Sequence, residues 1–255
     1  MKEIKYINHS LRGALTYIAL AVSVNLIYNF SAPLNRLVPG FLVFVIGYLP
    51  VYFFNDYTDR VEDAGNNKSN LYNLIPNHKF FWSLASIFLL TGLIGALYFS
   101  SQVLLLLVGL YGWNFLYSGR PFRLRDKFAW REITIFCLNI TKWYLVLALL
   151  GFDLSQSPTP IMLFVSSTLA ALTVIYKRTT DLRRSNLMLY LFGSISALSW
   201  GVSLWLYPQI FLLFVPLFPI AIFLHVKYEN RPAPNSKYLL AYIIYFAAVV
   251  LLTKT

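Results

Sequence analysis

Long apolar runs alternate with short polar segments along the whole chain. A helix that crosses a bilayer needs about 20 mainly apolar residues, and nine runs approach or reach that length. Backbone groups in hydrocarbon must be hydrogen-bonded within their own segment, so these runs are predicted to be α-helices. The predicted spans are Arg12–Phe30, Leu37–Phe54, Phe80–Phe99, Val103–Tyr117, Ile133–Gly151, Ile161–Tyr176, Leu187–Leu206, Ile210–Val226 and Tyr238–Leu252.

Composition supports lipid as the main solvent. Of the 255 residues, 58% are apolar and 12% are charged, whereas soluble domains are about a quarter charged. The net charge of +11 alone would suit nucleic acid or anionic lipid. No segment offers the continuous basic, polar surface of a nucleic-acid domain. We therefore expect a single all-α, multi-pass membrane domain over residues 1–255, with membrane lipid and not nucleic acid as a partner.

The placement of the cations predicts the orientation. With nine spans, the N-terminal segment and the loops after spans two, four, six and eight share one side, which carries 18 of the 21 Lys and Arg residues. The positive-inside rule makes that side cytoplasmic. The opposite side keeps only Arg36 and Lys254, and Lys142 falls inside span five. The 18 cations are Lys2, Lys5, Arg12, Arg60, Lys68, Lys79, Arg120, Arg123, Arg125, Lys127, Arg131, Lys177, Arg178, Arg183, Arg184, Lys227, Arg231 and Lys237.

Acids gather at the end of span two. Asp56, Asp59, Glu62 and Asp63 are four of the ten acids in the chain and lie within eight residues. We expect this segment to continue the helix of span two. Positions four apart lie on one helix face, so Asn55, Asp59 and Asp63 are predicted to form a stripe of oxygen ligands beside Asp56.

The acidic stripe needs a compensating cation, because like charges at this spacing destabilise a helix. Mg²⁺ prefers oxygen ligands and is often held by one or two carboxylates together with the phosphates of a substrate. The predicted metal ligands are Asn55, Asp59 and Asp63. The alternative is a solvated helix end whose acids pair with Arg60 and Lys68.

Two sequence blocks resemble the UbiA superfamily of intramembrane prenyltransferases. The pattern N-D-x-x-D-x-x-x-D from Asn55 to Asp63 is similar to the first aspartate-rich motif of that family, and Asn67–Asn70 looks like its following loop without the usual Arg-Pro pair. Tyr117–Arg125, which reads Tyr-Ser-Gly-Arg-Pro-Phe-Arg-Leu-Arg, is similar to the family's Tyr-Ser…Pro…Arg-Leu-Lys segment after helix four. The nine predicted spans agree with this resemblance.

The chain departs from the family after span six. Members usually carry a second motif, D-x-x-x-D, in that loop, but here only Asp181 remains, with Lys177 and Ser185 four positions before and after it. Arginine binds phosphate bidentately and keeps its charge, so nearby arginines can replace part of a metal site. They are equally well interpreted as anchors at lipid headgroups. These arginines are Arg178, Arg183 and Arg184.

The resemblance implies a Mg²⁺-dependent transferase of isoprenoid biosynthesis. Such an enzyme ionises an allylic isoprenoid diphosphate, meets the charge of the departing pyrophosphate with metal or guanidinium groups, and transfers the prenyl group to a lipophilic, aromatic acceptor in a dry pocket. The implied catalytic residues are Asn55, Asp56, Asp59, Asp63 and Asp181. The implied diphosphate-binding residues are Arg12, Lys68, Tyr117, Arg120, Arg123, Lys177, Arg178, Arg183 and Arg184.

Polar residues inside the spans are candidates for the acceptor cavity. A charged residue at the bilayer centre costs about 2.5–3.5 kcal/mol on insertion scales, which draws attention to Lys142. Asn139 lies three positions earlier on the same face, and Asn25 lies in span one. We predict that all three face the cavity. For Lys142 the alternative is snorkelling to the membrane surface.

Two other functions fit the same residues. A membrane terpene cyclase of the same superfamily would use the prenyl diphosphate as its sole substrate. A transporter or non-catalytic lipid-binding relative would explain the degenerate second motif. Transfer is preferred over cyclisation, and the intact first motif argues against a non-catalytic protein.

Overall fold

A computed structural model describes residues 32–65, 70–75, 77–127 and 130–153, together with isolated positions between residues 13 and 30 and at 205. Over these residues the chain is helical, with no strand. The predicted all-α class is confirmed for this part. Predicted span one is described only at isolated positions, and the four predicted spans after Gly151 lie outside the described residues apart from Trp205, so the count of nine remains a prediction.

Two compact units make up the chain. The first contains residues Met1–Ile18 and Ala32–Asp153, and the second contains residues Ala19–Ser31 and Leu154–Thr255. Most of the second unit lies outside the described residues. The helices and the site described below belong to the first unit.

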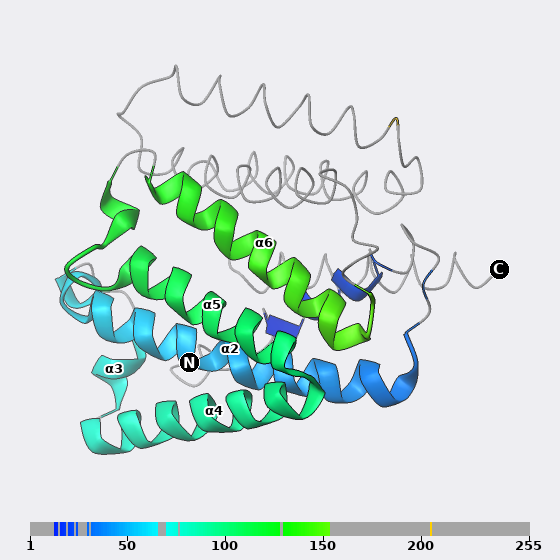
Figure 1. The fold of residues 1–255 in the computed structure, drawn as a ribbon. Helices are drawn as coiled ribbons and strands as arrows, with labels where there is room; N and C mark the ends of the chain where they lie inside the picture. Colours follow the sequence, from blue (N-terminus) through cyan, green and yellow to red (C-terminus); the bar gives the residue numbers. More distant parts are fainter. Residues whose placement is uncertain are drawn as a thin grey trace, which may run out of the picture. The chain divides into compact units, whose positions relative to one another are not determined.

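Four long helices of the first unit correspond to predicted spans two to five (Figure 1). Helix α2 does not stop where its apolar run ends at Phe54 but continues through the acidic segment, as the sequence predicts. A short helix and a 3₁₀ turn occupy the connections. The elements are α2 (Leu34–Gly65), α3 (Leu71–Leu74), α4 (His78–Phe99), α5 (Ser101–Ser118), η1 (Leu124–Asp126) and α6 (Trp130–Leu150).

Capping residues and a glycine determine where these helices begin and end. Asn77 caps α4 by accepting hydrogen bonds from the amides of Lys79 and Phe80. Ser100, the only residue between α4 and α5, caps α5 through the amide of Val103. Gly151, at φ +82°, ends α6 in a left-handed conformation that glycine adopts without steric cost.

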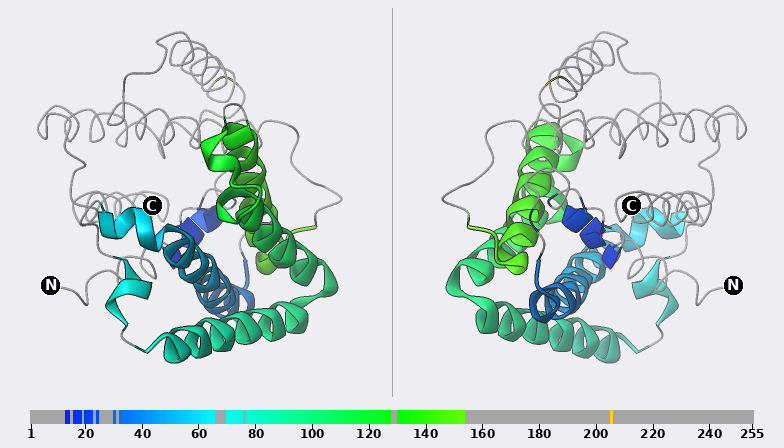
Figure 2. Two further views of the ribbon diagram at one scale, coloured as in Figure 1. Left: turned by 90° about the vertical axis from the view of Figure 1, so that its left-hand side faces the viewer. Right: turned by 90° about the vertical axis from the view of Figure 1, so that its right-hand side faces the viewer.

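The helices run in alternating directions, which gives the unit two distinct ends (Figures 1 and 2). We call one of them the polar end: it holds the end of α2, α3, the start of α4, the end of α5, η1 and the start of α6. The cations described at this end are Arg60, Lys79, Arg120, Arg123, Arg125, Lys127 and Arg131. At the opposite end Arg36 lies 6.0 Å from the Phe99 ring centroid. The loops after spans two and four therefore share an end, as predicted; the compartment they face remains a prediction.

Close packing joins α2 to its neighbours. A Cβ atom added to Gly92 of α4 would lie 2.7 Å from the Cα of Gly47, so the two backbones meet where both residues are glycine. The hydroxyl of Tyr111 on α5 donates to the carbonyl oxygen of Gly47 at 2.7 Å. Phe44 and Leu107 are almost fully buried nearby. These contacts hold α2 in a fixed position relative to α4 and α5.

An apolar stripe on α4 faces outward. Ile87, Leu90, Ile94 and Leu97 recur at helical spacing and are each more than half exposed. Such a surface is unfavourable in water and suits lipid. By length and composition, α2, α4 and the Ile133–Leu150 part of α6 can each cross a membrane. Within the described residues, the structure therefore supports a membrane protein.

Candidate functional site

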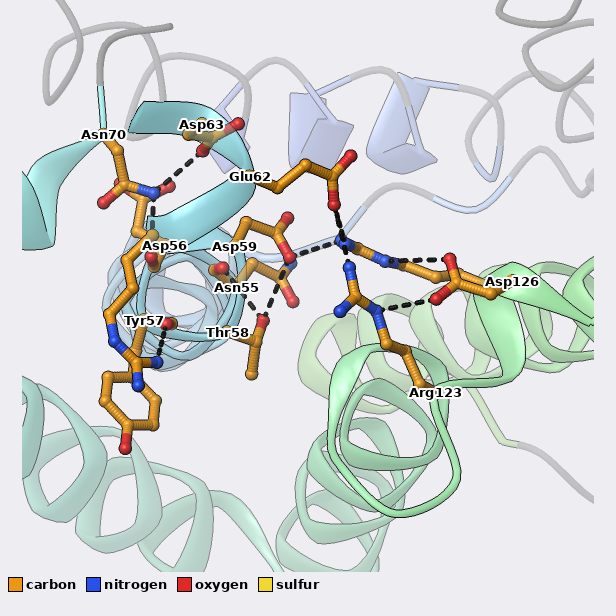
Figure 3. Close-up of polar contacts among 12 residues, drawn as sticks. Asn55, Asp56, Tyr57, Thr58, Asp59, Glu62, Asp63, Asn70, Arg123 and Asp126 are labelled. Carbon is orange, nitrogen blue, oxygen red and sulfur yellow. Dashed lines mark hydrogen bonds and ion pairs between the residues drawn. The ribbon is translucent and has the colours of Figure 1, made fainter. Parts of the chain in front are cut away.

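The two sequence blocks meet at the polar end, more than sixty residues apart in sequence (Figure 3). The guanidinium of Arg125 lies 2.5 Å from Asp59 Oδ1 and 3.0 Å from Glu62 Oε2. Arg123 lies 2.8 Å from the same Glu62 oxygen and 2.8 Å from Asp126 Oδ2. Three carboxylates and two guanidinium groups thus form one network between the end of α2 and the loop after α5.

The face that carries this network contains Glu62 in place of Asp63. At 3.6 residues per turn each residue advances about 100°, so the seventh residue after Asn55 returns to within roughly 20° of it and the eighth lies roughly 80° away. Asp59 and Glu62 accordingly meet Arg125. Asp63 is instead bonded to the side chain of Asn70. Of the predicted stripe, Asn55 and Asp59 share the arginine side, and Asp63 lies toward α3 (Figure 3).

Asn70 fastens the chain after α2 to the acidic helix end. Its side chain is almost completely buried, and its amide nitrogen donates to the carbonyl oxygen of Asp56 at 2.7 Å and to Asp63 Oδ2 at 2.8 Å. Its amide oxygen accepts from the Tyr72 backbone, which caps α3. The buried carboxylate of Asp56 accepts from the Leu71 amide at 2.9 Å. Asp56 and Asp63 therefore help to position α3.

Arg125 has a strongly favourable electrostatic environment. Burial of the guanidinium opposes its charge, but the hydrogen bond that it donates to Asp59 and the charges of Asp59, Glu62 and Asp126 outweigh this, and the pKa of Arg125 is raised above its ordinary value. Its side chain is only 15% exposed, whereas that of Glu62 is 54% exposed. Arg125 therefore stays positively charged at the acidic helix end.

Arg123 is held in an unusual backbone conformation. Its φ of 39° and ψ of 54° are left-handed, which costs a non-glycine residue roughly 1–2 kcal/mol. Arg123 precedes η1, and its ion pairs with Glu62 and Asp126 tie this turn to α2. The conformation directs two arginines separated by a single residue toward the same carboxylates.

Asn55 and Asp59 offer oxygen atoms that suit a hard cation. The Oδ1 atom of Asn55 is buried without a hydrogen-bond partner. Thr58 donates to the Asn55 carbonyl oxygen and lies 3.3 Å from Asp59 Oδ1, next to it. Amide and carboxylate oxygens are the ligands that Mg²⁺ prefers. Among the described residues, however, no three His, Cys, Asp or Glu side chains converge as a metal site. A metal here would therefore depend on further oxygens, such as those of a phosphate.

The alternative cations named from the sequence do not neutralise the stripe in the described residues. Arg60 turns to the opposite side of α2, where its guanidinium lies 4.2 Å from the Tyr57 ring centroid and 5.6 Å from that of Tyr72. Its Nη1 donates to the Tyr57 carbonyl oxygen. Lys68 lies outside the described residues. The neutralising charges come from the loop after α5.

Lys142 faces the interior of the helix group. Its Nζ lies 5.0 Å from the ring centroid of Tyr48 on α2, in the middle of both helices, so it does not extend to either end. Tyr48 contacts Tyr52, which lies one turn before Asn55 on α2. The aromatic face beneath Lys142 therefore leads along α2 to the acidic stripe. The Asn139 amide donates to the Ile135 carbonyl oxygen of its own helix.

The remaining predicted residues are dispersed or lie outside the described part. Tyr117 is half-buried in the last turn of α5, and Arg120 is exposed after it. The structure adds Glu62, Asn70 and Arg125 to the site. Arg125 belongs to the second sequence block, and that position was the sequence signal that could have identified it as a site residue. The predicted residues outside the described part are Arg12, Asn25, Lys68, Lys177, Arg178, Asp181, Arg183 and Arg184.

No family model, curated protein or solved structure matches this chain. A carboxylate and an amide oxygen can bind a divalent cation, and two adjacent arginines can bind phosphate oxygens. Together, at the end of a helix that is long and apolar enough to cross a membrane, they suit a lipophilic molecule with an anionic phosphate head.

Proposed function

We propose that this protein is an intramembrane prenyltransferase of the UbiA type. It ionises an allylic isoprenoid diphosphate with the help of Mg²⁺ and transfers the prenyl group to a lipophilic acceptor. The observation that carries the proposal is the contact of Arg125 with Asp59 and Glu62, and of Arg123 with Glu62, beside the unpartnered oxygen of Asn55. It brings the two resembling blocks together at one helix end.

The arrangement suits the separation of charge during ionisation. The departing pyrophosphate gains negative charge, and fixed cations next to it stabilise the transition state more than the ground state. Asn55 and Asp59 would hold Mg²⁺ through their oxygens, and the arginines would bind the phosphate oxygens bidentately. The metal would supply Lewis-acid stabilisation of the leaving group. The prenyl tail would lie along the apolar α2 face below Asn55.

The second loop remains part of this proposal. Asp181 and the neighbouring arginines are outside the described residues, so their contribution rests on the sequence resemblance. Lys142 above Tyr48 is the candidate for orienting a polar group of the acceptor. The polar end is proposed to face the cytoplasm, following the distribution of cations.

The test is product formation by purified protein with Mg²⁺ and a panel of prenyl diphosphates, with and without acceptors, followed by mass spectrometry. Asp59→Asn should reduce the rate at least about a hundredfold, the size of effect seen when one group that stabilises developing charge is removed. The matched control is Asp153→Asn, since Asp153 lies beyond the opposite end of α6. Full activity of Asp59→Asn in folded protein would refute the proposal.

The same experiment separates the other functions. A cyclic product that forms from the diphosphate alone, at a rate that no acceptor increases, would replace transfer with cyclisation. Binding of the diphosphate with no product from any donor would favour a lipid-binding or transport role.

A further inference from the structure

Before any ligand is bound, the guanidinium of Arg125 supplies the positive charge that the carboxylates of Asp59 and Glu62 need. Its two terminal nitrogens lie against Asp59 Oδ1 and Glu62 Oε2, and its side chain is only 15% exposed. We infer that Arg125 is an exchangeable counter-ion, which leaves Asp59 when Mg²⁺ binds and then takes part in binding the diphosphate. This inference rests on the proposed function and assigns to Arg125 a role that the sequence resemblance did not give it.

The reason for an exchange is competition for one carboxylate. Asp59 Oδ1 is the atom that Arg125 contacts, and it lies on the side of α2 that carries the unpartnered oxygen of Asn55 (Figure 3). If Asn55 and Asp59 bound a divalent ion, that ion and the guanidinium of Arg125 would both contact Asp59 Oδ1. Coulombic repulsion in a partly buried site then opposes simultaneous binding. Metal binding and the Asp59–Arg125 ion pair are therefore mutually exclusive or mutually weakened.

Glu62 keeps the released guanidinium at the site. It contacts both Arg125 and Arg123, and it is more exposed than Asp59. An arginine that leaves Asp59 but remains near Glu62 stays within a side-chain movement of a phosphate group bound to the metal. Arginine suits this task because its planar group binds two phosphate oxygens at once.

The exchange predicts that the ligands bind interdependently. Mg²⁺ alone must displace Arg125 without providing it a new partner, so its affinity should be low. Mg²⁺ together with a diphosphate provides the new partner, so each ligand should raise the affinity for the other by the same factor. A purely structural ion pair makes a different prediction: its removal would weaken or leave unchanged the affinity for Mg²⁺ alone.

The experiment measures binding rather than turnover. Calorimetry of the full chain in detergent gives the affinity for Mg²⁺ alone and for inorganic pyrophosphate in the presence of Mg²⁺. Arg125→Gln should raise the affinity for Mg²⁺ alone roughly five- to tenfold, and should lower pyrophosphate affinity roughly tenfold or more, since hydrogen bonds between charged groups are among the strong ones. Lys127→Gln, at an exposed position of the same loop that the site does not include, is the matched control and should change neither value.

The outcomes distinguish failure of the exchange from failure of the proposed function. If wild type binds Mg²⁺ and pyrophosphate but Arg125→Gln binds Mg²⁺ alone no more tightly, the exchange is refuted while the proposed function stands. If wild type binds neither Mg²⁺ nor pyrophosphate, the proposed function itself fails. Should Arg125→Gln not fold, Arg125→Met is measured, because it removes the charge and keeps an unbranched side chain; an Mg²⁺ affinity equal to that of wild type would then overturn the inference.

Discussion

The Asn70→Asp variant tests whether the buried amide organises the acidic helix end. Aspartate also caps helices well, so the hydrogen bond to Tyr72 is retained and only the two bonds from the amide nitrogen are lost. A carboxylate oxygen would then face the carbonyl oxygen of Asp56 and the carboxylate of Asp63, which lie 2.7 and 2.8 Å from the present nitrogen. The variant therefore replaces two attractions with repulsion.

The magnitude follows from the two bonds. A neutral hydrogen bond contributes about 1 kcal/mol and one to a charged group about 1.5–3 kcal/mol, so we expect a loss of about 2.5–4 kcal/mol. For a protein of this size that corresponds to a fall in Tm of roughly 5–16 °C. The assay is thermal unfolding in detergent. The control is Asn73→Asp on the same short helix, because the Asn73 amide makes one exposed bond to the Arg60 carbonyl oxygen. Equal Tm values for the two variants would show that Asn70 does not have this role.

Two further predictions concern packing and orientation. Gly92→Ala should lower the Tm in detergent by several degrees, because the new methyl would meet a backbone Cα of α2 at 2.7 Å and overpacking costs about 1–3 kcal/mol; Gly112→Ala, with nothing within 4 Å, should not lower it. In a Cys137→Ser background, cysteine at Ser69 should be protected from an impermeant reagent added to intact cells, whereas cysteine at Ser101 should react. Labelling of Ser69→Cys from outside would contradict the predicted topology.

Helix positions followed from the sequence because run length and apolarity are local properties. Each of the predicted spans two to five falls within an observed helix or within one residue of its end, and the extension of α2 through Asp63 was also predicted. The residues that make up the site were harder to predict. Counting in steps of four placed Asp63 on the stripe, but each such step rotates the position by about 40° around the helix axis. Glu62, and not Asp63, therefore lies on the same face as Asn55. A step of seven residues would have identified Glu62.

The ion-pair partners of the acidic residues could not be predicted from the spacing of residues in the sequence. Arg125 reaches Asp59 because the loop after α5 turns through a left-handed residue, Arg123, and no periodic pattern encodes that turn. The alternative, in which the acids pair with Arg60, differs from the structure for a related reason. One residue after Asp59, Arg60 projects about 100° away, toward Tyr57 and toward Tyr72 of α3. Long-range ion pairs depend on loop geometry, which the sequence leaves open.

The single-residue connection at Ser100 has a consequence for biogenesis. With Ser100 alone between them, α4 and α5 have no loop that could cross the membrane separately or remain outside while one helix inserts. If both helices cross the membrane as the sequence predicts, they therefore enter the bilayer together as a hairpin, with the backbone groups satisfied within each helix. An epitope tag or protease site inserted at Ser100 would separate this insertion unit and should reduce the amount of protein that reaches the membrane, even though the position is far from the acidic helix end.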